Sequence, residues 1–160
     1  MIKVFGGSAS PFDAWLTNIG LKTFEIRMER HCRNAMAIAE FLSENPKVAR
    51  VCYPGLSDDP GHEIAKRQME AFGGMLSFEL KGGLEAGETM MNQVRMTTLA
   101  VSLGNVDSLI EHPASMTHRN VPRDELEQMG ISEGLVRLSV GIENVEDIIR
   151  DLDGALSSVP

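Results

Sequence analysis

The residue that points most clearly to a chemical role is Arg137, inside the segment Leu135–Val140. Side chains there alternate as in a strand, so that Arg137 shares one face with Ser139 while Val136 and Leu138 lie on the other. A buried guanidinium needs an anionic partner, and its planar fork matches a carboxylate through two parallel hydrogen bonds. The spacing leaves two interpretations open: Arg137 binds the carboxylate of a ligand, or it is solvated or paired within the protein.

A second group of polar residues lies in segment 100–104, Ala-Val-Ser-Leu-Gly, and in the loop 112–118, His-Pro-Ala-Ser-Met-Thr-His. A strand end that leads into a proline-fixed polar loop can present N–H groups and hydroxyls to a small anion, although loops of this composition are often simple turns. His112 and His118 have no third ligand at a metal-site spacing. We therefore expect no metal site and expect both histidines to be hydrogen-bonded loop residues.

Composition limits the classes of partner. The chain has 160 residues, of which 42% are hydrophobic and 24% charged, and its net charge is −8. This balance is typical of a globular domain, and the negative charge argues against binding to nucleic acid or anionic lipid. There is no apolar run of about 18 residues and no secretory signal at the N-terminus, so we expect a cytoplasmic protein with no membrane partner. Cys32 and Cys52 are expected to be buried thiols.

The elements that must position these residues can be predicted from periodicity. Residues 1–19 are expected to form an arm and residues 20–160 a domain, which opens on a long helix over 20–45 that stops before Pro46. Strands are predicted over 48–53, 75–80, 98–103 and 135–140, and helices over 61–69, 84–95, 106–110, 124–129 and 145–156. Helices must cover at least one face of such a sheet, and the alternation of elements favours parallel pairing.

Motifs along nearly the whole chain resemble the family of pyridoxal-phosphate (PLP) enzymes that contains methionine γ-lyase, cystathionine γ-synthase and acylhomoserine sulfhydrylase. The matching segments keep their order and are found at residues 10–16, 20–23, 53–56, 73–75, 77–78, 100–104, 112–118 and 135–143. The resemblance implies an α+β fold, the small carboxy-terminal domain of fold type I PLP enzymes. Its sheet would be mainly antiparallel, four-stranded and flanked by helices, with a long connecting helix before it. Residues 1 to about 40 would pack against a cofactor domain and expose apolar surface here.

The resemblance also implies a chemistry, which is β- or γ-elimination or γ-replacement on sulfur amino acids or activated homoserine, with PLP as electron sink. By position, Arg137 would bind the substrate α-carboxylate and Ser102 would help to position the substrate. Leu103, Gly104 and Met116 would be wall residues. Methionine γ-lyase is the most similar member, through segments 79–83 and 130–135.

This chain departs from the family in one important respect. The Schiff-base lysine of the family lies in a Ser-x-Thr-Lys segment, and no lysine of this chain stands in such a context. We therefore expect no catalytic residue in this chain, no PLP binding by it alone and no activity on its own. Its expected partners are an amino-acid substrate and a cofactor domain or sister subunits, since members are usually homotetramers. The alternative is a non-catalytic module for oligomerisation or amino-acid binding.

Overall fold

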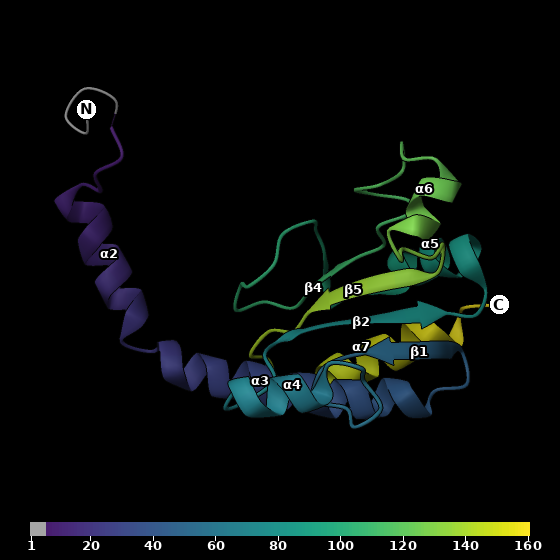
Figure 1. Cartoon of the computed structure of the whole chain (residues 1–160), viewed down its shortest axis with the longest axis horizontal. Coiled ribbons are helices and arrows are strands. Elements are labelled where there is room, and N and C mark those ends of the chain that lie inside the picture. The colour runs from purple at the N-terminus through teal and green to yellow at the C-terminus, as the bar shows by residue number, and fades with distance from the viewer. Residues whose placement is uncertain (1–5) are drawn as a thin grey trace.

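The protein is described by a computed structural model that covers residues 6–160. Two helices form its amino-terminal part: α2 (Pro11–Leu21) stands away from the rest, and α3 (Phe24–Glu44) runs along the body of the molecule, as Figure 1 shows. Helix α2 begins with a capping box, in which the Ser10 hydroxyl accepts a hydrogen bond from Asp13 N and the Asp13 carboxylate accepts from Ser10 N. Helix α3 ends at Glu44, just before Asn45 and Pro46, as the sequence predicts.

The body is built on a five-stranded mixed sheet with the strand order β1-β2-β5-β4-β3. The strands are β1 (Val48–Cys52), β2 (Met75–Leu80), β3 (Thr98–Leu99), β4 (Leu109–Glu111) and β5 (Leu135–Ser139). All neighbours pair antiparallel except β3 and β4, which are parallel. The antiparallel sheet implied by the family resemblance is confirmed, whereas the parallel pairing favoured by alternation alone is wrong for every pair but the last.

The fifth strand corrects the prediction of a helix over 106–110. Backbone hydrogen bonds from Thr98 N to Ser108 O and from Ala100 N to Ile110 O hold this segment in the sheet. Leu109 and Ile110 are both buried, so the apolar pair enters the core as part of β4. Strand β3 is correspondingly shorter than the predicted strand over 98–103.

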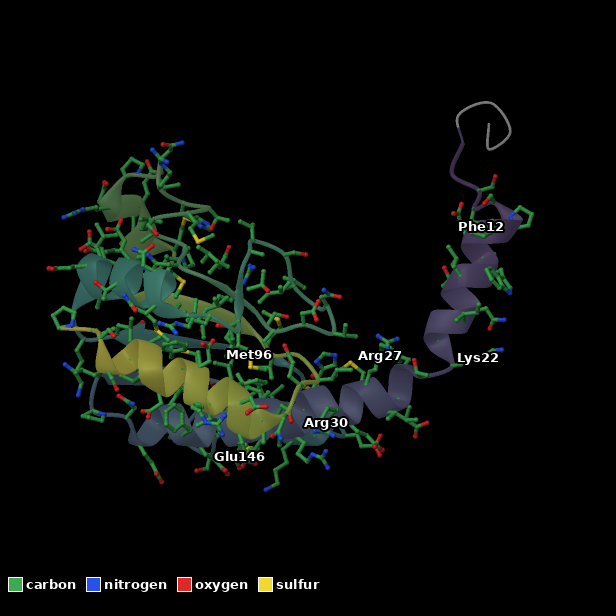
Figure 2. The ribbon with its side chains drawn as sticks, turned by 180° about the vertical axis from the view of Figure 1, so that it is seen from behind. Phe12, Lys22, Arg27, Arg30, Met96 and Glu146 are labelled. Carbon is green, nitrogen blue, oxygen red and sulfur yellow. The ribbon has the colours of Figure 1, made fainter. Side chains whose placement is uncertain are left out.

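Helices α3, α5 (Gly83–Gln93) and α7 (Val145–Ser157) cover one face of the sheet, and α3 and α7 are seen from behind in Figure 2. The side chains packed between sheet and helices are fully buried; they include Phe78, Leu138, Ile38, Met90 and Ile148. Two short helices, α4 (His62–Gln68) and α6 (Arg123–Gln128), complete the body. On β2 and β5 every second side chain points away from this core and is mostly half-buried, so the opposite face of the sheet is open.

Both cysteines are half-buried, which corrects the expectation of buried thiols. Cys52 lies on the open face of the sheet, where its sulfur accepts hydrogen bonds from Nε and Nη2 of Arg50 at 3.2 and 3.0 Å. Cys32 lines a hollow between α3 and residues 69–71.

Helix α2 runs across residue 19, where the sequence divides arm from domain, and the bend between the two helices falls at residues 22–23. The domain boundary itself stays a prediction. None of the helices within residues 6–160 is both long enough and apolar enough to cross a membrane.

Candidate functional site

Arg137 lies in the middle of the open sheet face. Its strand, β5, is flanked by β2 and β4, and the register places Ser77 on one side of Arg137 and Glu111 on the other. Alternation predicts this orientation correctly, because Val136 and Leu138 are fully buried beneath it. The guanidinium is therefore carried by the rigid centre of the sheet.

Three contacts hold the guanidinium. Its Nη1 is 3.1 Å from Oε1 of Glu111, and its Nη2 donates to the backbone carbonyl of Val101 at 2.6 Å and, more weakly, to that of Ser102 at 3.3 Å. The Glu111 side chain is 3% exposed and that of Arg137 is 28% exposed. Arg137 is thus paired within the protein, but part of its guanidinium remains exposed. This geometry is compatible both with an internally paired arginine and with an arginine that binds the carboxylate of a ligand.

The loop beside Arg137 is fixed by its own hydrogen bond. Gly104 adopts a left-handed conformation with φ of 76° and donates from its backbone N to the Ser139 hydroxyl at 2.9 Å. The side chains of Val101 and Leu103, in the segment just before Gly104, are both exposed. Exposed apolar side chains next to a half-buried arginine form a surface suited to a ligand with one carboxylate and one apolar part.

Two hollows adjoin this surface. A shallow one of about 240 Å³ is lined by Arg137 together with Cys52, Met75, Leu76 and Ser77. A smaller one of about 140 Å³ lies beside it and is mostly apolar; its lining includes Met28, Met75, Leu103, Gly104 and Val140. Met75 belongs to both hollows, so they are neighbours.

Of the five predicted site residues, Gly104 is part of the tethered loop and three more lie around it, whereas Met116 lines a separate hollow. Arg137, the Ser102 carbonyl and Leu103 lie around the same tethered loop. Met116 lines a different hollow, shared with Glu88, Met91 and Leu99, and its sulfur accepts a hydrogen bond from His112 N. His112 directly follows Glu111, the ion-pair partner of Arg137, and the role of Met116 as a wall residue stays a prediction.

The histidines of the 112–118 loop are hydrogen-bonded, as predicted. His112 is fully buried, with Nδ1 2.8 Å from the Ser115 hydroxyl oxygen and Nε2 2.7 Å from the Glu133 carbonyl oxygen. His118 Nδ1 lies 2.8 Å from Oγ1 of Thr117. Within residues 6–160 no group of three or more His, Cys, Asp or Glu side chains is arranged to hold a metal ion.

Sequence reasoning misses Glu111 and the role of Ser139. Glu111 is an acidic residue directly after two apolar ones, and this pattern would have indicated a strand end if residues 106–110 had not been assigned to a helix. Once β4 is recognised, antiparallel register with β5 brings Glu111 opposite Arg137. The sequence therefore does not predict Glu111 as the partner of Arg137 because it does not show that β4 pairs with β5.

The lysines with described contacts lie at another part of the sheet. Nζ of Lys81 donates to the Pro46 carbonyl at 2.7 Å, and Nζ of Lys47 donates to the Val159 carbonyl at 2.9 Å. Both amino groups are held where β1 begins and β2 ends, whereas Arg137 is opposite Ser77 in the middle of β2. The described residues thus place a half-exposed guanidinium on the open face, and these two amino groups lie away from it.

The fold matches that of a solved enzyme. The crystal structure of metB from Corynebacterium glutamicum superposes with a TM-score of 0.85 at 49% identity, over 95% of this chain and 39% of that one. The protein therefore has the fold of a small α+β domain found within a PLP enzyme. A family profile described as Cys/Met metabolism PLP-dependent enzyme matches residues 1–157. The chain belongs to this family.

Curated relatives of the chain are enzymes of sulfur amino acid metabolism. An L-methionine γ-lyase of Fusobacterium nucleatum subsp. polymorphum is 58% identical over 96% of this chain and 39% of its own length. A cystathionine β-lyase of Coxiella burnetii is 53% identical over 96% of the chain and 40% of its own length. The chain spans about two fifths of the length of these relatives. The family depends on PLP, and its relatives act as lyases on sulfur amino acids.

Proposed function

We propose that this chain supplies the substrate-carboxylate side of a PLP-dependent enzyme that performs β/γ-elimination or γ-replacement on sulfur amino acids, in the manner of methionine γ-lyase. The observation that carries the proposal is the half-buried guanidinium of Arg137 on the open sheet face, fixed by Glu111 and by the Val101 carbonyl. The 58% identity to an L-methionine γ-lyase favours that reaction over the replacement reactions.

In this proposal Arg137 binds the α-carboxylate of the substrate through charge-assisted hydrogen bonds. Ser102 keeps the arginine in position through its backbone carbonyl, and Leu103 forms part of the apolar wall. A fixed carboxylate restricts rotation of the substrate, which orients the bond at Cα that must break. PLP, when bound by the cofactor domain, supplies an electron sink for the charge that develops at Cα.

We further propose that the chain is inactive alone, because the proton-transferring lysine would come from the cofactor domain. The test is release of a 2-oxo acid from L-methionine by the purified chain with added PLP, beside the same chain mixed with a separately expressed cofactor domain of the F. nucleatum relative. Activity only in the mixture is expected. Activity of the chain alone would overturn the inactivity proposal, and no activity in either sample would count against the reaction.

A second candidate is a non-catalytic module for oligomerisation. The favouring observation is the apolar surface of α2, where Phe12, Trp15, Leu16 and Ile19 are all exposed. Gel filtration distinguishes the candidates. A module adapted to oligomerise should elute as one defined species, whereas a domain that lacks its partner should associate without a fixed stoichiometry.

A further inference from the structure

Glu111 is the most deeply buried charged group next to the open face. Its side chain is 3% exposed, and only Oε1 has a partner, Nη1 of Arg137. The other oxygen, Oε2, is buried and has no hydrogen-bond partner within the described part of the chain. A buried carboxylate with one unpartnered oxygen is unfavourable, since water would solvate both oxygens.

The pairing of Glu111 with Arg137 has two separable effects. The hydrogen bond to Nη1 fixes one end of the guanidinium, while the Val101 carbonyl fixes Nη2. The negative charge, in addition, partly neutralises the arginine before any ligand arrives. A carboxylate bound to the exposed part of the same guanidinium would lie close to that of Glu111, and two negative charges this near to each other repel.

We propose that Glu111 is a positioning residue for Arg137 whose charge also weakens carboxylate binding, so that the site holds carboxylates in one orientation and still releases them. This inference rests on the proposed function, in which Arg137 binds the substrate carboxylate. The orientation comes from the hydrogen bond, and the weakening comes from the charge. A glutamine at position 111 would keep the hydrogen bond that orients Arg137 and remove the negative charge that weakens carboxylate binding.

The experiment uses the full chain, with arginine side chains labelled with ¹⁵N and followed by NMR. Three variants are compared with the unchanged chain: Glu111→Gln, Glu111→Ala and the control Glu79→Gln. Glu79 lies on the same sheet face as Arg137 but in register with Leu135, so its change removes an equal charge without touching the guanidinium. The probes are L-methionine and its primary amide, which lacks the negative charge.

For the unchanged chain we expect the Arg137 side-chain signals to shift saturably with L-methionine and not with the amide. Glu111→Gln should tighten L-methionine binding on the order of tenfold, because the repelling charge is gone while the hydrogen bond remains. Glu111→Ala should tighten it less, because the guanidinium then loses an anchor. Rotation of the guanidinium should stay slow in Glu111→Gln and become faster in Glu111→Ala. Glu79→Gln should change neither the affinity for L-methionine nor the rate of guanidinium rotation by more than about twofold.

The two readouts separate failure of this inference from failure of the proposed function. If L-methionine and its amide shift Arg137 equally or not at all, the carboxylate site of the proposed function is wrong, while guanidinium rotation still tests the positioning role. If Glu111→Gln binds L-methionine no more tightly than the unchanged chain, the charge effect is overturned. If rotation is the same in Glu111→Ala and the unchanged chain, Glu111 does not position Arg137.

Discussion

At the scale of single residues, the stability of the open face should depend on the pair formed by Arg137 and Glu111. Replacing Arg137 by methionine leaves the buried Glu111 carboxylate without its counter-charge, and we expect this to lower the free energy of unfolding by about 2–3 kcal/mol. The double change Arg137→Met with Glu111→Gln should recover at least half of that loss, because no uncompensated charge remains. Urea denaturation of the single and double variants measures the loss of unfolding free energy and its recovery.

The exposed pair between Arg123 and Glu133 provides the control. Its atoms are 2.7 Å apart, but both side chains are well exposed, so water and salt screen the charges. Arg123→Met should change the free energy of unfolding by less than about 0.5 kcal/mol. Equal losses for Arg123→Met and Arg137→Met would show that burial of Glu111 carries no special cost.

Asp151 should make the stability depend on pH. Burial raises the pKa of its carboxyl, but hydrogen bonds from the backbone N–H groups of Thr97 and Arg95 and from the Thr97 hydroxyl outweigh burial, and the net pKa is lowered. A carboxyl with a lowered folded-state pKa stabilises the fold above its unfolded pKa of about 3.9 and loses this contribution as pH falls through the folded value.

Asp151→Asn should therefore be less stable than the unchanged chain at pH 7, and the difference should shrink below about pH 4. Thermal unfolding followed by circular dichroism at a series of pH values would measure it. A difference that is constant from pH 7 to pH 3 would mean that the ionised carboxylate is not what holds residues 95–97.

The sequence predicts the residue-scale features that depend on local alternation and misses those that depend on pairing. Arg137 is placed on the correct face because a period of two fixes which side chains share a face. Its partner Glu111 is 26 positions earlier in the sequence and meets it only through the register of two strands. Nothing local encodes that register.

At the scale of elements, helix α5 is packed against His112 so closely that it requires a glycine. A Cβ at Gly87 would lie 2.2 Å from Nε2 of His112, which is itself fully buried and hydrogen-bonded on both nitrogens. We expect Gly87→Ala to lower the free energy of unfolding by about 1–3 kcal/mol despite the higher helix propensity of alanine. Denaturant unfolding measures the change.

Gly154 in α7 is the matched control, because a Cβ there would meet no atom within 4 Å. Gly154→Ala should raise the free energy of unfolding by about 0.5–1 kcal/mol, as expected for a helix position without steric conflict. If both substitutions stabilise the protein, α5 can move away from His112 and the close packing is not required.

Elements with a strong internal period are the ones that the sequence predicts best. Strand β2 is predicted with its observed bounds, and α7 within one residue, because alternation and an amphipathic stripe are local patterns. Strand β4 has only three residues, all buried, and therefore no alternation to reveal it. Its place between β3 and β5 comes from tertiary pairing.

At the scale of the whole molecule, the dominant feature is the apolar surface that the amino-terminal helices leave uncovered. None of the residues of α2 is buried, and Trp15 is 56% exposed. In Figure 2, Phe12 lies on the helix that stands away from the body, far from Met96. The sequence predicts exposed apolar surface here through the family resemblance, and this is confirmed. The Trp15 ring lies beside that of Phe12 on the same helix, and this exposed apolar surface is suited to burial against another chain or domain.

Trp15 is the only tryptophan of the chain, which makes it a specific reporter for this surface. We expect a 5-fluorotryptophan label at this position to give a ¹⁹F resonance typical of an exposed indole in the chain alone. Adding the unlabelled cofactor domain should shift the resonance, because burial replaces water around the ring by protein atoms. Phe12→Ser with Leu16→Ser should abolish the shift while leaving the body folded, since neither side chain contributes to the core. An unchanged resonance in a mixture that is enzymatically active would show that the arm is not the surface that joins this chain to its cofactor domain.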